Sequence, residues 1–497
     1  MRNVPVWMKT ASQASSTTNT PTSSARSKID PTEYTQPFLK FISENPTVFH
    51  TIDYFSKRLT DSGFTKLSER KSWHTIEKGG KYFFQRNGSG LIAFIIGENY
   101  EAGNGAAIIA SHVDALTTKL KPISAKSTKA GFVQLGIAHY GGALNQTWLD
   151  RDLGIGGRVF VKNEKTGVIE SKLVKLDWPI ARIPSLAPHF GIEAEGQANR
   201  ETRMVPIIGL DNSDATGKVE EEQVKPALLG GASTFATTQP PRLIKAIAGE
   251  MGIQDRSQIV NWELEVFDTQ PAQLGGLDKE FIFAGRIDDK LCSFSAIEGL
   301  LASDPEDSSI IRMVGLFDDE EVGSLLRQGA RSNFLPTAME RITEAFAGET
   351  SAGILSQAYA NSFLISADVS HAVNPNYLDV YLESHLPRLN IGVTIQADSN
   401  AHMTTDGFST SFLQRIASKC DSQLQVFQIR NDSRSGGTVG PMLSSMTGIR
   451  AIDAGLPQLS MHSIRATTGA LDPGLGVRLF CGFFEEFEGV DAEFGDA

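Results

Sequence analysis

The feature that most constrains the fold is a short apolar run that ends in four consecutive carboxylates. Residues 312–324 read RMVGLFDDEEVGS, in which an apolar stretch precedes Asp318, Asp319, Glu320 and Glu321. Such a run is typical of a strand buried on both faces, and open α/β sheets bind ligands at the carboxyl ends of their strands. The carboxylates therefore predict either a solvated acidic loop, which is the common role of a charge run, or a site where a divalent metal offsets their charge.

Four other segments place metal-ligand residue types after apolar, strand-like runs. They contain the motifs SHVD, RIDDK, SADVSH and SMHS, which supply His112, Asp114, Asp288, Asp289, Asp368, His371 and His462. Alternate residues of a strand share a face, so the spacing lets Asp114 support the imidazole of His112. Each motif alone also fits a plainer interpretation, namely a surface ion pair, a helix N-cap carboxylate or a hydrogen-bonded core histidine.

Taken together, these acidic and imidazole side chains form a ligand set that suits zinc or its divalent neighbours. The three cysteines are too few and too scattered for a thiolate metal cluster, which favours an open hydrolytic site over a structural zinc site. Two adjacent metals need one bridging carboxylate and mixed ligands on each side, and the five segments can supply them. The residues therefore indicate metal-assisted hydrolysis without assigning individual roles.

The bulk properties exclude several other classes of protein. The net charge of −12 and the pI near 5.3 argue against nucleic-acid binding, which needs a basic surface. No apolar stretch approaches the roughly 20 residues needed to span a bilayer, so we expect no membrane span. The three cysteines are too few for a disulfide framework and fit a reducing compartment.

The composition and the residue pattern along the chain predict three regions. Residues 1–30 are rich in Ser and Thr, and have the composition of a disordered tail or an organelle presequence. Residues 31–114 and 275–497 alternate strand-like and helix-like segments, as in one α/β domain. Residues 115–274 carry mainly short strand-like segments and turns, which predicts a β-rich insertion in that domain.

Longer motifs identify a family. The segments ASHVDALTTKLKP, WLDRDLGIGGRV, RIPSLAPHFG, RIDDKLCSF, FDDEEVGSLLRQGA, ADVSHAVNPNY, RNDSRSGGTVGP and QLSMHSIRATTG resemble those of the aspartyl aminopeptidase family of dinuclear zinc exopeptidases. The resemblance covers roughly residues 32–495 in order, and is strongest to the fungal vacuolar branch. It implies an α/β/α sandwich catalytic domain interrupted by a β-rich dimerisation or lid domain.

The resemblance also implies metal ligands. His112 and Asp368 match the ligands private to one zinc ion, Glu321 and His462 match those private to the other, and Asp288 matches the bridging carboxylate. Two Zn²⁺ per subunit are expected, with Mn²⁺ or Co²⁺ as alternative occupants.

Three further residues match catalytic positions of the family. Glu320 matches the general base, and Asp114 matches the carboxylate that orients His112. His189 matches a histidine that completes the site of a neighbouring subunit, although a loop histidine between subunits without a chemical role is the alternative.

The family's assembly and location give further expectations. Its members form tetrahedral dodecamers that act on peptides with a free N-terminus, so a homo-oligomer of this kind is expected here. A selective-autophagy receptor is a further expected partner. The vacuole is the expected location, with the cytoplasm as the alternative, because residues 1–30 lack the amphipathic charge pattern of the vacuolar propeptide.

One departure from the family pattern bears on specificity. Acid-selective relatives carry a lysine where this chain has Gln396, and a later position of the pocket reads Ala401-His402-Met403. Without a cation to pair with a substrate carboxylate, the pocket has no reason to prefer Asp or Glu. We therefore expect cleavage of neutral, leucine-like residues, with acidic residues as the alternative.

Two other classes of function are disfavoured by the sequence. A self-assembling cargo or scaffold particle with minor catalysis is disfavoured because Glu320 and all five matched ligands are retained. A nucleotide site built on DLGIGGR lacks the full glycine spacing and the helix start that such a loop needs. Gly154, Gly156 and Gly157 are instead expected to be turn glycines.

Overall fold

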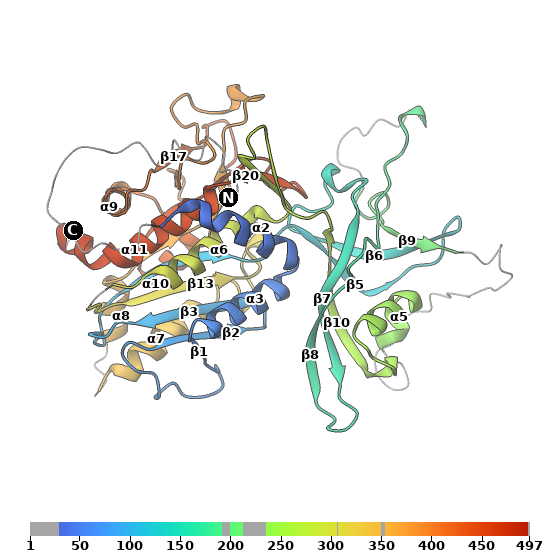
Figure 1. Ribbon diagram of the computed structural model, residues 1–497, viewed down its shortest axis with the longest axis horizontal. Helices are drawn as coiled ribbons and strands as arrows, with labels where there is room; N and C mark the ends of the chain where they lie inside the picture. The colour runs from blue at the N-terminus through green and yellow to red at the C-terminus, as the bar shows by residue number, and fades with distance from the viewer. Residues whose placement is uncertain (1–28, 191–198, 212–234, 306, 349–352, 496–497) are drawn as a thin grey trace, which may run out of the picture.

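The computed structural model of the chain (Figure 1) describes residues 29–190, 199–211, 235–305, 307–348 and 353–495. The predicted tail, residues 1–30, falls almost wholly outside them. A nine-stranded sheet forms the centre of the larger body. Its strands, in spatial order, are β1 (Thr65–Lys66), β2 (Lys81–Arg86), β3 (Gly90–Ile96), β13 (Ile311–Phe317), β4 (Ala106–His112), β14 (Phe363–Ser366), β18 (Arg450–Gly455), β16 (Thr394–Ala397) and β17 (Gln425–Gln428).

Helices cover both faces of this sheet. One face packs against α2 (Thr35–Glu44), α3 (Val48–Asp61), α6 (Ile287–Ala302), α9 (Gly407–Lys419) and α11 (Asp472–Phe494). The other face packs against α7 (Phe334–Phe346), α8 (Ile354–Ala360) and α10 (Val439–Thr447).

The central strands explain this layering because they are apolar on both sides. In β4, Ile109 packs in the cluster that contains Phe294 and Phe484, whereas Ile108 packs in the cluster that contains Phe334. Successive residues of a strand point to opposite faces, so an uninterrupted apolar run must be covered twice. The α/β fold class predicted from the sequence is confirmed.

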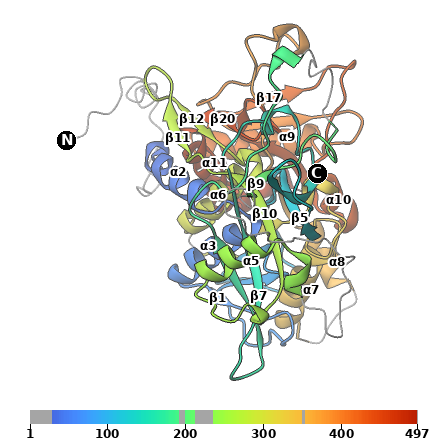
Figure 2. The same cartoon turned by 90° about the vertical axis from the view of Figure 1, so that its right-hand side faces the viewer.

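A second sheet projects from this body, to the right in Figure 1 and toward the viewer in Figure 2. Its order is β8 (Ile169–Lys175), β7 (Leu153–Lys162), β10 (Ile259–Asp268), β5 (Thr117–Ala125), β6 (Phe132–Tyr140) and β9 (Ile207–Leu210). Helix α5 (Pro241–Glu250) packs on it through an apolar cluster that includes Ile247 and Trp262. The sheet lies within the predicted insertion, residues 115–274.

Two smaller sheets complete the described fold. Strands β11 (Gln273–Gly275), β12 (Phe281–Ala284) and β20 (Ala466–Gly469) form a three-stranded sheet, and β15 (Ser370–His371) pairs with β19 (Pro457–Gln458). In the part of the chain that the structure describes, no helix combines the length and the apolar character needed to cross a membrane.

The prediction that Gly154, Gly156 and Gly157 are turn glycines is wrong, because all three lie inside strand β7. Gly157 has φ +149°, and a Cβ placed there would overlap the backbone oxygen of Glu263 on the paired strand β10. These glycines therefore permit close approach of the neighbouring strand, which is a common reason for glycine within a sheet.

Candidate metal centre

Three neighbouring parallel strands end beside one another at the site. Strands β13, β4 and β14 are adjacent and parallel in the nine-stranded sheet. His112 is the last residue of β4, Asp368 lies two residues after β14, and Glu320 and Glu321 begin the short turn η6 (Glu320–Val322) after β13. Because the carboxyl ends of parallel strands meet at one edge, these side chains share a small volume.

Two more side chains reach this edge from outside the large sheet. Asp288 lies in the first turn of α6, and His462 lies in the loop between β19 and β20, where its φ is +64°. The sequence predicted five strand-like segments, each followed by a ligand residue. Three of them are β4, β13 and β14 of the large sheet, whereas β12 of a smaller sheet precedes Asp288 and the two-residue strand β19 precedes His462.

The five side chains form two triads that share Asp288. His112, Asp288 and Asp368 can each offer a ligand atom to one ion, and Asp288, Glu321 and His462 can do the same for another. Asp288 Oδ1 lies 3.2 Å from His112 Nε2, and its Oδ2 lies 3.7 Å from His462 Nε2. The two carboxylate oxygens of Asp288 thus face different triads.

The electrostatics of the triads fit a divalent cation. Burial, together with the charge of Asp288, raises the pKa of Glu321 well above its usual range. Burial would lower the pKa of His112, but Asp368 and Asp114 together raise it well above the ordinary histidine value. The Glu321 Oε1 atom is buried with no hydrogen-bond partner among the described residues. A bound cation would offset this crowded negative charge and take the unpartnered oxygen as a ligand.

Glu320 lies beside the triads but belongs to neither. Its Oε2 atom is 3.9 Å from His112 Nε2, and its side chain is 13% exposed. Burial raises the pKa of Glu320 to about 8; His112 opposes this shift and Asp368 adds to it. A carboxylate near the metal ligands but not among them is placed to exchange a proton with a water molecule there.

Asp114 contacts both His112 and the turn that carries Glu320 and Glu321. Its Oδ1 lies 3.2 Å from His112 Nδ1, which leaves Nε2 facing the triad. The backbone N–H groups of Glu320 and Glu321 donate to Asp114 Oδ1 and Oδ2, at 3.2 and 3.1 Å. Burial would raise the pKa of Asp114, but hydrogen bonds from His112 and Tyr140 lower it. The acidic run is not a solvated loop, because Asp318 and Asp319 are buried as well.

Two other predicted site residues belong to neither of the triads found among the described residues. His189 lies in the exposed turn η3 (Pro188–Phe190) and belongs to neither triad among the described residues. Gln396 lies on β16, is 5% exposed, and donates from Nε2 to the backbone oxygen of Asp368 at 3.0 Å. The position matched to the family lysine is therefore next to one triad.

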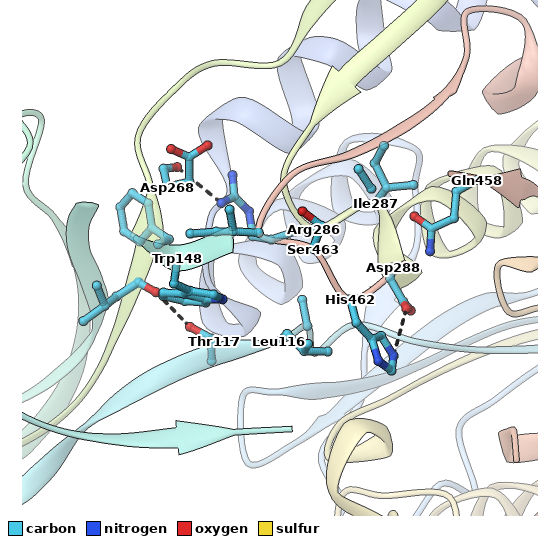
Figure 3. Close-up of a pocket in the computed structure, with 15 residues that line it drawn as sticks. Leu116, Thr117, Trp148, Asp268, Arg286, Ile287, Asp288, Gln458, His462 and Ser463 are labelled. Carbon is cyan, nitrogen blue, oxygen red and sulfur yellow. Dashed lines mark hydrogen bonds and ion pairs between the residues drawn. The ribbon is translucent and has the colours of Figure 1, made fainter. Parts of the chain in front are cut away.

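A pocket opens beside the shared aspartate (Figure 3). Asp288 and His462 face each other on one side, and Leu116 and Trp148 line the other. Gln458 lies beside Asp288 and is buried, with neither of its side-chain polar atoms hydrogen-bonded to a described residue. Gln458 carries no local signal in the sequence, because a glutamine after a proline is not a distinctive pattern.

The site places two acid-and-histidine triads at the carboxyl ends of three parallel strands within a mixed sheet, with Asp288 and His462 added from a helix start and a loop. Such a site defines a metal-dependent hydrolase. Residues 41–484 match the family described as Aminopeptidase I zinc metalloprotease (M18). The chain is also 44% identical to Vacuolar aminopeptidase 1 of Saccharomyces cerevisiae over 93% of this chain and 90% of that protein. It therefore belongs to the M18 family and is a zinc-dependent aminopeptidase. Other relatives carry the name aspartyl aminopeptidase.

Solved structures agree with this assignment. The structure of Chaetomium thermophilum mApe1 is 53% identical, with a TM-score of 0.86 over 94% of this chain and 100% of that chain. The structure of the S. cerevisiae mApe1 dodecamer is 40% identical, with a TM-score of 0.82 over 94% of this chain and 99% of that chain.

Proposed function

We propose that the protein removes neutral, leucine-like residues from the N-terminus of peptides, with two zinc ions held by the triads and Glu320 as general base. The observation that carries this proposal is the pair of triads sharing Asp288, with Glu320 beside them and outside both. Bound zinc supplies Lewis-acid polarisation of the scissile carbonyl and acidifies water. His112 and Asp368 would hold one ion, and Glu321 and His462 the other.

The protein's own residues then account for the proton transfers. Glu320 accepts the proton of the attacking water and passes it to the amine that leaves. Asp114 keeps the backbone of Glu320 and the ring of His112 in a fixed relation, so the base and the ligand stay aligned. A free N-terminal amine of the substrate bound at this site would make the enzyme an aminopeptidase rather than an endopeptidase.

Initial rates on Leu, Met, Ala, Glu, Asp and Lys aminoacyl substrates test the substrate class. We expect Leu to be cleaved fastest by the zinc-loaded protein, because Gln396, at the position matched to the family lysine, offers no cation to a substrate carboxylate. Faster cleavage of Glu or Asp would support an acid-selective aminopeptidase. Absence of cleavage for every substrate would support the scaffold alternative.

Gln396 provides a direct test of specificity. Replacing Gln396 with Lys is expected to raise the ratio of acidic to neutral kcat/KM about 10-fold or more, because one charge-assisted hydrogen bond is worth roughly 1.5–3 kcal/mol. The expectation rests on its place next to Asp368. Gln396→Met is the matched control, since it removes the polar group without adding charge. An unchanged ratio in Gln396→Lys would show that this residue does not contact the substrate side chain.

Assembly and location complete the proposal. We infer a tetrahedral homododecamer in which His189 completes the site of a neighbouring subunit. The exposed position of His189 in η3 and the dodecameric structure of S. cerevisiae mApe1 support this. The vacuole is the proposed location, supported by the name of the S. cerevisiae relative. A selective-autophagy receptor stays a prediction from the family resemblance.

A further inference from the structure

One segment of the second sheet's body passes close to both triads. Residues 140–147, the strap, run from the end of β6 into η2 (Gln146–Trp148). At Gly141, a Cβ would lie 3.1 Å from the Cβ of Glu321, and at Gly142 one would lie 3.8 Å from His462 Nδ1. The strap backbone therefore rests against two matched ligands, although none of its own residues belongs to a triad.

The first end of the strap reaches His112 through Asp114. The Tyr140 hydroxyl donates to Asp114 Oδ2 at 2.7 Å, and Asp114 Oδ1 lies 3.2 Å from His112 Nδ1. A phenol has one proton to donate. Asp319 lies farther from it, at 3.2 Å, and accepts a hydrogen bond from Gln328. Tyr140 therefore fixes the carboxylate that sets the ring orientation of His112.

The second end of the strap holds the loop that carries His462. Asn145 Nδ2 donates to the backbone oxygen of His462 at 2.9 Å. Thr147 Oγ1 accepts the N–H of Ile464 at 3.0 Å. Asn145 Oδ1 accepts the N–H of Thr147, which identifies the nitrogen of the amide as the atom facing His462. This contact matters because His462 has a left-handed backbone that the surrounding structure must maintain.

We propose that Tyr140 and Asn145 are positioning residues for two different metal ions: Tyr140 for the ion held by His112 and Asn145 for the ion held by His462. The inference rests on the ligand sets of the proposed function. The inserted sheet would then help to position the metal ligands of its own chain, because residues 140–147 supply the hydrogen bonds that orient those ligands. Loss of such an outer partner typically lowers metal affinity about 10–100-fold.

The experiment measures zinc affinity in chains that retain one site each, by competition with a chelating dye. The His462→Ala background keeps the His112 site, and the His112→Ala background keeps the His462 site. Tyr140→Phe is expected to weaken zinc binding about 10-fold or more in the first background, and to have a much smaller effect in the second. Asn145→Asp, which can still cap η2 but cannot donate, is expected to show the reverse pattern.

Matched controls separate positioning from general destabilisation. Tyr82→Phe removes a buried hydroxyl that accepts the Glu77 N–H at 2.9 Å, and Asn104→Asp removes a donor to the Ser309 backbone oxygen at 2.8 Å. Both lie outside the site, and both are expected to leave zinc affinity unchanged.

The outcomes distinguish the inference from the proposed function. Site-selective weakening supports the inference. If Tyr140→Phe and Asn145→Asp leave zinc affinity unchanged, or weaken both sites equally, the inference is overturned while the ligand sets stand. If the parent chain binds fewer than two zinc ions, or if His112→Ala and His462→Ala each keep both, the ligand sets are wrong and the inference falls with them.

Discussion

Replacing Glu320 with Gln is expected to lower kcat about 10²–10⁴-fold while both zinc ions and the assembly are retained. The amide preserves the shape of the side chain but cannot accept the proton of the attacking water. Glu320 is outside both triads, so its loss removes no ligand atom. The measurement is kcat on a Leu substrate, with zinc per chain and molecular mass determined on the same samples.

The neighbouring residue supplies the matched control. Glu321→Gln changes the next carboxylate in the same turn, but Glu321 belongs to a triad with Asp288 and His462. This variant is expected to lose zinc as well as activity, whereas Glu320→Gln loses activity alone. If Glu320→Gln kept more than a tenth of the parent kcat, another group would be the base.

The sequence was most informative where a local pattern determines the outcome. The apolar runs of β4, β13 and β14 identified the central sheet, because burial on both faces needs continuous apolar residues. The polar residues directly after those runs identified His112, Glu321 and Asp368 as neighbours, because parallel strands end at one edge.

The sequence was less informative where packing between distant segments determines the outcome. A glycine in the sequence is compatible with a turn or with a strand. Only the proximity of β10 explains why Gly157 lies in a strand. Tyr140 and Asn145 contact residues 26 and 317 positions away along the chain, in Asp114 and His462. Such contacts between distant segments leave no local pattern in the sequence.

Replacing Asp288 with Asn is expected to weaken the binding of both zinc ions, whereas replacing any other single ligand should mainly weaken the binding of one. Its two oxygens face different triads, with Oδ1 at 3.2 Å from His112 and Oδ2 at 3.7 Å from His462. The amide keeps one oxygen and places a donor where the other ion must bind. We expect affinity losses beyond the roughly 10–100-fold typical of outer partners, and activity near background.

The adjacent aspartate shows whether this effect comes from bridging or from general loss of charge. Asp289 is fully buried, accepts a hydrogen bond from Ser111 at 2.6 Å and belongs to neither triad. Asp289→Asn preserves the shape of the side chain and removes no ligand atom of either triad. Asp289→Asn should therefore keep both ions. The measurement is the zinc content per chain after gel filtration. If Asp288→Asn kept the zinc content of the parent protein, or kept one full ion, Asp288 would not bridge the two sites.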